Sequence, residues 1–214
     1  MRRVASVIFD CDGVLFDSRQ ANTLFYNHIL AHFGLRPMEN DEESFVHMHT
    51  ADESIRHIFR GTGYENQAQT YRMKMDYSPF IRDMVVEPDL MELLRFLKPH
   101  CGLAIATNRS NTISEVLRRH GLAGFFDIVI SSLDVSNPKP HPECILRILH
   151  FFQITPDEAI YVGDSLVDSR TARAAGVPFI AYKNPELDAD YHVTRHMDIA
   201  SLLRVTGGKI TESC

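Results

Sequence analysis

Short apolar runs alternate along this chain with longer amphipathic stretches, and this alternation constrains the fold more than any other feature. The apolar runs predict strands at residues 4–10, 102–107, 126–132, 159–164 and 177–182, and a last short strand near 190–193. The amphipathic stretches predict helices at 110–120, 142–152 and 166–175, and near 197–204. Buried strands that alternate with helices indicate an α/β fold, in which helices cover both faces of a parallel sheet.

The region after the first strand interrupts this alternation. From Phe16 to about Arg82 no convincing strand pattern occurs, and apolar residues such as Phe25, Ile29 and Phe33 recur at helical spacing. The α/β order then resumes. We therefore predict a core domain formed by residues 1–15 and 83–214, with a helical domain, residues 16–82, inserted after the first strand.

Composition and charge restrict the partners and the compartment. The 214 residues are 44% hydrophobic and carry a formal net charge of −6, with no block of Lys or Arg, which argues against a nucleic-acid partner. No apolar run approaches the roughly 20 residues of a membrane span, and Asp10 interrupts the first run too early for a signal peptide. We expect a cytoplasmic protein, a monomer or homodimer, that binds a small molecule and not a membrane.

Polar residues stand where the best predicted strands end. Asp10 closes the first strand and is followed by Asp12, Thr107 closes the second, and Asp164 closes the strand at 159–164. Because the carboxyl ends of parallel strands lie along one edge of a sheet, we expect these side chains to meet. An isolated pair of aspartates is a weak signal, but a second strand that also ends in Asp strengthens it.

Asp168 adds another carboxylate four residues after Asp164. If a helix begins near Ser165, both acids project to the same side of its first turn. Helix capping would account for one acid there, but not for several carboxylates that converge. Their mutual repulsion calls for a cation, and hard oxygen ligands suit Mg²⁺.

Donors for a phosphate follow the second and third strands. Lys139 lies between prolines in the segment "NPKPHPE", and Thr107 and Asn108 begin the segment "ATNRS". Taken alone, Lys139 would be expected to be a solvated loop charge. Together the three residues supply an ammonium, a hydroxyl and amide groups, which are the donors that a phosphate requires.

The segments "DCDGVLFDS", "ATNRS", "NPKPHPE" and "GDSLVDSRTARAAG", in this order, resemble the four motifs of the haloacid dehalogenase (HAD) superfamily. The similarity is to its phosphatase branch, which includes phosphoglycolate phosphatase and β-phosphoglucomutase. The resemblance implies a Rossmann-like core and an α-helical cap at residues 16–82. It implies that Asp10 is the nucleophile that becomes an aspartyl-phosphate and that Asp12 is the general acid and base. It also implies that Thr107 and Lys139 bind the phosphate. The implied Mg²⁺ ligands are Asp10, Asp164 and the backbone carbonyl of Asp12, with Asp168 as a supporting acid.

Asp12 favours phosphoryl transfer over dehalogenation, because a halide leaving group needs no proton. The leading hypothesis is a Mg²⁺-dependent phosphatase acting on a small phosphorylated metabolite, and the alternative is a phosphomutase of the β-phosphoglucomutase type. A phospho-acceptor signalling module is less favoured, because no helical insert interrupts the first loop of such modules.

The predicted cap leaves the substrate open. The segment "ESFVHMHTADESIRHIF" lacks the glycine expected from the resemblance. His47, His49 and His57 could face the ligand, but His47 and His49 cannot share a helix face, and we expect all three to be surface polar residues. We expect His28 and His32 to form the polar side of a cap helix instead of a zinc site.

Overall fold

The computed structural model describes residues 4–205. Its main sheet has six strands in the order β5-β4-β1-β6-β7-β8, and every neighbouring pair is parallel. This sheet confirms the predicted fold class. The strands are β1 (Ser6–Phe9), β4 (Gly102–Ala106), β5 (Ile128–Ile130), β6 (Ala159–Gly163), β7 (Phe179–Tyr182) and β8 (Tyr191–Val193).

Helices cover both faces of this sheet because successive strand residues point to opposite sides. Val7 and Phe9 of β1 pack into one apolar cluster with α6 (Leu90–Leu97), α7 (Ile113–Arg119) and α10 (His196–Val205). Ile8 packs on the other face with α8 (Glu143–Phe152) and α9 (Leu166–Ala175), and a short 3-10 turn, η1 (Pro156–Glu158), precedes β6. The first strand is thus buried on both sides.

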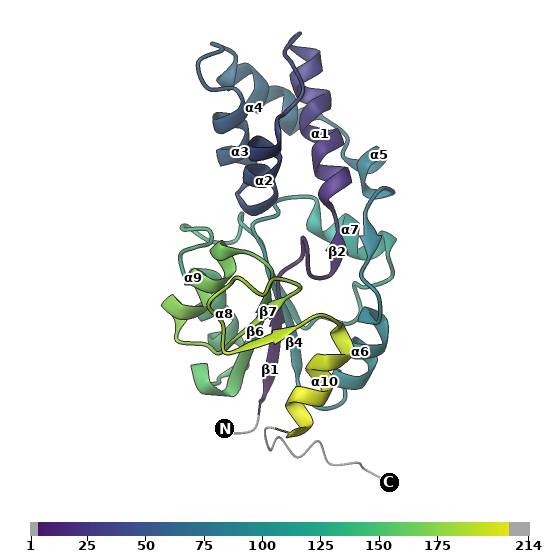
Figure 1. Ribbon diagram of the computed structural model, residues 1–214, viewed down its shortest axis with the longest axis vertical. Helices are drawn as coiled ribbons and strands as arrows, with labels where there is room; N and C mark the ends of the chain where they lie inside the picture. Colours follow the sequence, from purple (N-terminus) through teal and green to yellow (C-terminus); the bar gives the residue numbers. More distant parts are fainter. Residues whose placement is uncertain (1–3, 206–214) are drawn as a thin grey trace.

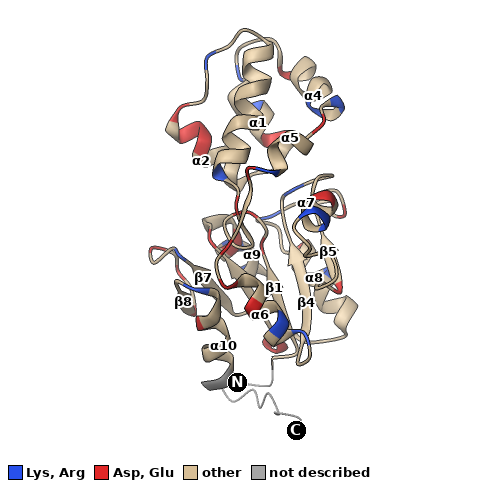
Figure 2. Ribbon diagram, turned by 90° about the vertical axis from the view of Figure 1, so that its right-hand side faces the viewer, with Lys and Arg blue, Asp and Glu red and all other residues tan. Residues whose placement is uncertain are grey.

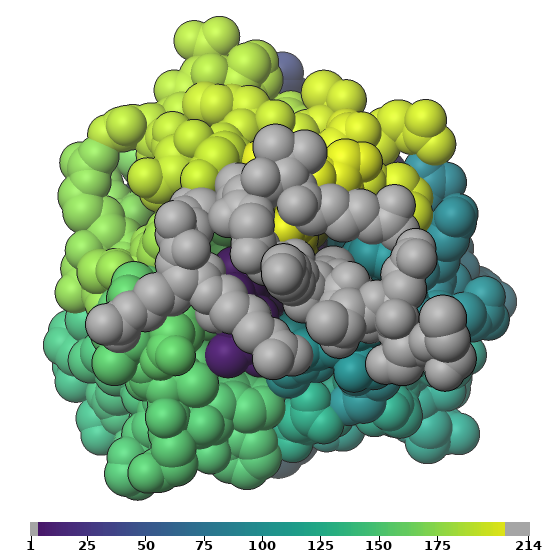
Figure 3. Space-filling view, turned by 90° about the horizontal axis from the view of Figure 1, so that it is seen from below, coloured from purple at the N-terminus to yellow at the C-terminus, as the bar shows by residue number. Residues whose placement is uncertain are grey.

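Figure 3 views the molecule from the end opposite the helical region. Atoms from the start of the chain lie near the centre of this face, among segments from the middle and the end of the sequence. The strand that opens the sequence is therefore central in the sheet, with β4 on one side and β6 on the other.

The helices between β1 and β4 that lie apart from the sheet form a separate helical lobe, at the top of Figure 1. They are α1 (Arg19–His32), α2 (Asn40–Met48), α3 (Ala51–Ile58), α4 (Glu65–Lys74) and α5 (Ser78–Ile81). Phe25, Ile29 and Ile55 belong to an apolar cluster of this lobe, distinct from the two clusters on the faces of the sheet. Burial of this cluster stabilises the lobe in the same way that the other two stabilise the sheet.

A ribbon of two short antiparallel strands joins the lobe to the sheet. Strand β2 (Phe16–Asp17) pairs with β3 (Val85–Val86), so the chain enters and leaves the lobe side by side. Strands of two residues are too short to show any hydrophobic period, and the sequence did not predict them. The proposed domain boundaries, at 15/16 and 82/83, fall beside this ribbon and stay a prediction.

The charged residues are interspersed over both parts of the chain. Figure 2 shows Lys and Arg next to Asp and Glu on the helical lobe and around the sheet. Within residues 4–205, none of the helices has the length and apolar character needed to cross a membrane.

Candidate active site

The strand order reverses at β1, and the residues that follow the strands there line one cavity. Asp10 follows β1, Thr107 follows β4 and Asp164 follows β6. All three line a cavity of about 280 Å³ between the carboxyl edge of the sheet and the helical lobe. A crevice at such a reversal is the usual ligand site of an open α/β sheet.

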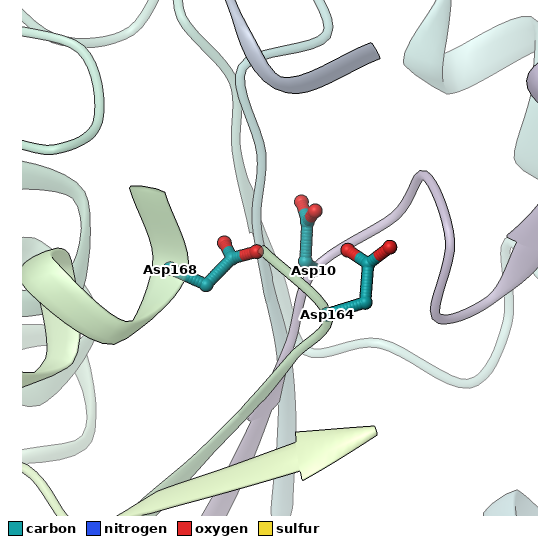
Figure 4. Close-up of side chains that lie close together, drawn as sticks. All are labelled: Asp10, Asp164 and Asp168. Carbon is teal, nitrogen blue, oxygen red and sulfur yellow. The ribbon is translucent and has the colours of Figure 1, made fainter. Parts of the chain in front are cut away.

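Three carboxylates converge at the floor of this cavity and just beneath it, where Asp168 is fully buried. One carboxylate oxygen from each of Asp10, Asp164 and Asp168 lies within 4.8 Å of the other two. Figure 4 shows the three side chains close together. Asp164 precedes α9, whose N-cap is Ser165, and Asp168 belongs to the first turn of that helix. The two acids of this segment therefore approach the floor from a loop and from a helix, respectively.

Lys139 neutralises part of this cluster. Its Nζ lies 2.8 Å from Asp10 Oδ1 and 2.7 Å from Asp168 Oδ1, and its side chain is only 3% exposed. Burial opposes the charge of the ammonium, but the two carboxylates more than offset this and raise the pKa of Lys139. The residue is thus a buried, charged member of the site and not a solvated loop lysine.

Asp168 holds this lysine and the start of α9 at the same time. Oδ1 accepts hydrogen bonds from Lys139 Nζ and from the Tyr161 hydroxyl, both at 2.7 Å. Oδ2 accepts from the backbone amide of Ser165 at 3.1 Å and from its hydroxyl at 2.5 Å, which closes a capping box. Because both of its oxygens accept hydrogen bonds from protein donors, Asp168 holds Lys139 and the first turn of α9 in position. Tyr161, which sequence reasoning did not assign, completes the arrangement from β6.

The remaining two acids of the floor lack full compensation. Burial raises the pKa of Asp10 to about 7; Lys139 opposes the shift and Asp168 adds to it. Burial and the nearby charges of Asp168 and Asp10 raise the pKa of Asp164 well above its usual value. A cation bound near Asp10 and Asp164 would stabilise the ionised form of both carboxylates. Their hard oxygen atoms suit a divalent metal ion. The donor set therefore fits a metal.

Asp12 lines the same cavity but turns its carboxylate to Arg109. The guanidinium contacts both oxygens, with Nη2 2.5 Å from Oδ1 and Nε 3.0 Å from Oδ2. Burial disfavours the ionised carboxylate, but Arg109 outweighs this effect and lowers the pKa of Asp12 to about 2. Sequence reasoning gave Arg109 no role, although it stands in "ATNRS" directly after Thr107 and Asn108. Its position next to these two predicted phosphate ligands was the sequence feature that could have pointed to a role.

The predicted phosphate ligands lie at the cavity, with different contacts. The Thr107 hydroxyl accepts a hydrogen bond from the Arg109 amide at 3.0 Å. The Asn108 side chain accepts from the Lys139 amide at 3.0 Å and donates to the Lys139 carbonyl at 3.1 Å, so it fixes the lysine loop. The phosphate-binding roles of these residues stay predictions.

His47 corrects one expectation from the sequence. Its side chain is 6% exposed and lines the cavity, with Nε2 3.9 Å from Asp164 Oδ2, so the expected surface position is wrong. Among residues 4–205, neither ring nitrogen of His47 has a hydrogen-bond partner. The packing of α2 over the sheet edge produces this burial, and the spacing of residues along α2 does not reveal it.

The other histidines of the lobe lie elsewhere. His49 and His57 are half-buried and stack on opposite sides of Phe45, with ring centroids 3.8 and 3.9 Å from that of the phenyl ring. His28 and His32 are exposed on α1, as predicted.

Comparison with known proteins identifies the class. A family model described as haloacid dehalogenase-like hydrolase matches residues 7–182. A phosphoglycolate phosphatase of Rhodobacter capsulatus is 27% identical over 95% of this chain and 97% of its own. A pyrophosphatase PpaX of Bacillus velezensis is 25% identical over 97% of this chain and 99% of its own. A solved HAD-superfamily hydrolase, subfamily IA, variant 1, from Geobacter sulfurreducens is 39% identical, with a TM-score of 0.83 over 93% of this chain and 99% of that chain.

The chain belongs to the haloacid dehalogenase-like hydrolases. Within that family it stands with the phosphatases, the class to which the resemblance of its four motifs points.

Proposed function

We propose that this protein is a Mg²⁺-dependent phosphatase that hydrolyses a small phosphorylated metabolite through an aspartyl-phosphate at Asp10, in the cytoplasm. The observation that carries the proposal is the position of Asp10. Its carboxylate stands at the reversal of strand order, at the floor of a cavity, 2.8 Å from a buried ammonium and beside Asp164.

In the first step an Asp10 oxygen attacks phosphorus and the bond from phosphorus to the ester oxygen breaks. Asp12, released from Arg109 and protonated, donates a proton to that departing oxygen. In the second step Asp12 takes a proton from a water molecule, the water oxygen bonds to phosphorus, and the bond to Asp10 breaks. Inorganic phosphate and the free alcohol leave, and both aspartates return to their starting state.

Lys139 and Thr107 would hold the phosphoryl oxygens while the attack proceeds. Lys139 also keeps the Asp10 carboxylate in place through its direct contact. When bound by Asp10, Asp164 and the carbonyl of Asp12, Mg²⁺ would offset the negative charge of the transferring phosphoryl group. Residues of the helical lobe, such as Phe25 and His47, line the cavity, and the lobe would limit the access of bulk water.

The test is phosphate release by the purified protein with Mg²⁺, first from p-nitrophenyl phosphate and then from a panel of phosphorylated metabolites. The panel includes 2-phosphoglycolate and pyrophosphate, because similar proteins bear those substrates in their names. Mass spectrometry of the quenched reaction should find a phosphoryl adduct on the peptide that contains Asp10. Absence of turnover on every member of the panel would contradict the proposal.

A phosphomutase uses the same groups but returns the phosphoryl group to a sugar. Incubation with β-glucose 1-phosphate separates the two activities. Isomerised sugar phosphate without net release of phosphate would favour the mutase over the hydrolase.

A further inference from the structure

Arg109 occupies both carboxylate oxygens of Asp12, the residue to which the proposed function gives the proton transfers. Nη2 lies 2.5 Å from Oδ1 and Nε 3.0 Å from Oδ2. The guanidinium occupies the side of the carboxylate between its two oxygens, so a leaving oxygen that approaches from this side must displace it. For Asp12 to serve a leaving group there, Arg109 has to move away.

Apart from Asp12, the contacts of Arg109 are neutral: Asn22 of α1 at 3.3 Å, Thr112 at 3.2 Å, and the Tyr77 ring, whose centroid is 5.3 Å away. Asp76 and Glu115 also line the cavity, but they are engaged by Ser78 and by Arg118 and Arg119. Within residues 4–205, Asp12 is the one carboxylate that forms an ion pair with Arg109. The side chain is 6% exposed, so an unpaired guanidinium here would be costly.

The other cations that line the cavity are already committed. Lys139 lies between Asp10 and Asp168 at the floor. Arg72 of α4 pairs with Asp52 at 2.9 Å. Arg109 is thus the cation placed on the side of Asp12, where a leaving group would lie, and where the core meets the helical lobe.

We propose that the substrate carries a second anionic group on its leaving-group side, a carboxylate or a phosphate, and that Arg109 transfers from Asp12 to this group when the substrate binds. The inference rests on the proposed function and names the substrate class of the same site. Exchange of one bidentate partner for another keeps the buried guanidinium paired throughout. It frees Asp12 only when a substrate with the second anion is present, so Arg109 makes turnover depend on that group.

His47 independently indicates that this cavity receives a polar ligand. Its side chain is buried, and both ring nitrogens lack a hydrogen-bond partner among the described residues. Buried polar groups in native proteins are rarely left without a partner. A bound anionic molecule would supply an acceptor for a ring N–H of His47 on the lobe side of the cavity.

The first experiment compares substrates with and without the second group: 2-phosphoglycolate differs from ethyl phosphate only in this group, and pyrophosphate presents it on a phosphoanhydride. We expect kcat/KM with Mg²⁺ for 2-phosphoglycolate or for pyrophosphate to exceed that for ethyl phosphate by about 100-fold or more, because a site built for a polar partner rejects the analogue that lacks it. The member of the first two whose kcat/KM falls more when Arg109 is replaced by Gln distinguishes a carboxylate from a phosphate as the second anion. Equal rates on all three would overturn the inference.

The second experiment changes the arginine. Arg109→Gln should reduce the preference for the anionic substrate to less than about tenfold and raise its KM, and Arg109→Lys should keep part of the preference as a point charge. Arg147→Gln, which removes an exposed pair with Glu143 on α8, is the matched control and should keep the wild-type preference. If Arg109→Gln keeps the preference, or speeds all substrates equally, Arg109 does not select the substrate.

The substrate comparison on the wild-type protein needs no variant and separates the two proposals. Failure to release phosphate from any of these compounds or from p-nitrophenyl phosphate counts against the phosphatase function itself. Hydrolysis of neutral and anionic esters at similar rates leaves that function standing and overturns only the role of Arg109.

Discussion

The ammonium of Lys139 lies 2.8 Å from Oδ1 of Asp10, and this contact joins the loop after β5 to the end of β1. Asp168 lies on the other side of the ammonium, at 2.7 Å. One buried cation thus contacts two buried carboxylates and offsets part of their charge. The same contact orients the proposed nucleophile, so stability and activity depend on one side chain.

Replacement of Lys139 by Ala should destabilise the fold and abolish turnover. Asp10 and Asp168 would remain buried without their counter-charge, which is expected to lower the free energy of unfolding by about 3–5 kcal/mol. Urea denaturation without Mg²⁺ measures this. The control is Lys98→Ala, which removes a partly exposed pair with Asp127 and should cost about 0–1 kcal/mol. Equal losses in the two variants would contradict the proposed balance.

Asp10→Asn should reduce the turnover of p-nitrophenyl phosphate by about 1000-fold or more while the protein stays folded, because the amide is not a competent nucleophile. Phosphate release measures the activity, and circular dichroism checks the fold. Appreciable activity in a folded variant would refute the assignment of Asp10.

Mg²⁺ should raise the melting temperature of the wild-type protein, because an ion that binds only the folded state stabilises it. Removal of metal with EDTA should abolish activity, and added Mg²⁺ should restore it. Asp164→Asn should lose both the thermal shift and the activity. A wild-type protein that remains active in EDTA, with a melting temperature insensitive to Mg²⁺, would speak against the metal site.

Gly13→Ala should damage the site more than the fold. Gly13 has φ +81° and packs so closely on Asp164 that a β-carbon would overlap the carboxylate. Gly121 has φ +70° with open space around it, so Gly121→Ala carries the same backbone cost, about 1–2 kcal/mol, without the overlap. Only Gly13→Ala is expected to lose Mg²⁺-dependent activity. Equal activity in the two variants would show that the close approach does not matter.

His196 should make the stability depend on pH. It is fully buried beside the Tyr182 hydroxyl, at 3.1 Å, and burial lowers its pKa below the usual 6.5. A lowered pKa means that its contribution is fully present above pH 6.5 and is lost as the pH falls through the folded-state pKa, because the unfolded chain binds the proton more readily.

We therefore expect the unfolding free energy to fall as the pH is lowered below 6.5, and to fall less in His196→Gln. The exposed His192 of β8 provides the control, and His192→Gln should keep the wild-type slope. Denaturant titrations at several pH values measure these slopes. A slope in His196→Gln as steep as in the wild type would show that other groups account for it.

Most of the fold could be predicted from the sequence, because hydrophobic period is a local property. The helix predicted at 166–175 is observed at Leu166–Ala175, between its Ser165 cap and Gly176. The strand predicted at 126–132 shortens to Ile128–Ile130 because it lies at the edge of the sheet and pairs only with β4. Pairing with a neighbour, which the sequence does not show, decides where a strand ends.

For the site, the sequence by itself determined which carboxylates stand at the ends of β1 and β6, since a buried strand that ends in Asp delivers that residue to the sheet edge. Only the tertiary structure decided the partner of each one. Asp10 meets Lys139, Asp12 meets Arg109, and His47 of the lobe is buried against Asp164. These contacts join residues far apart in the chain, and they depend on how the lobe and the sheet pack together, which no spacing along the sequence encodes.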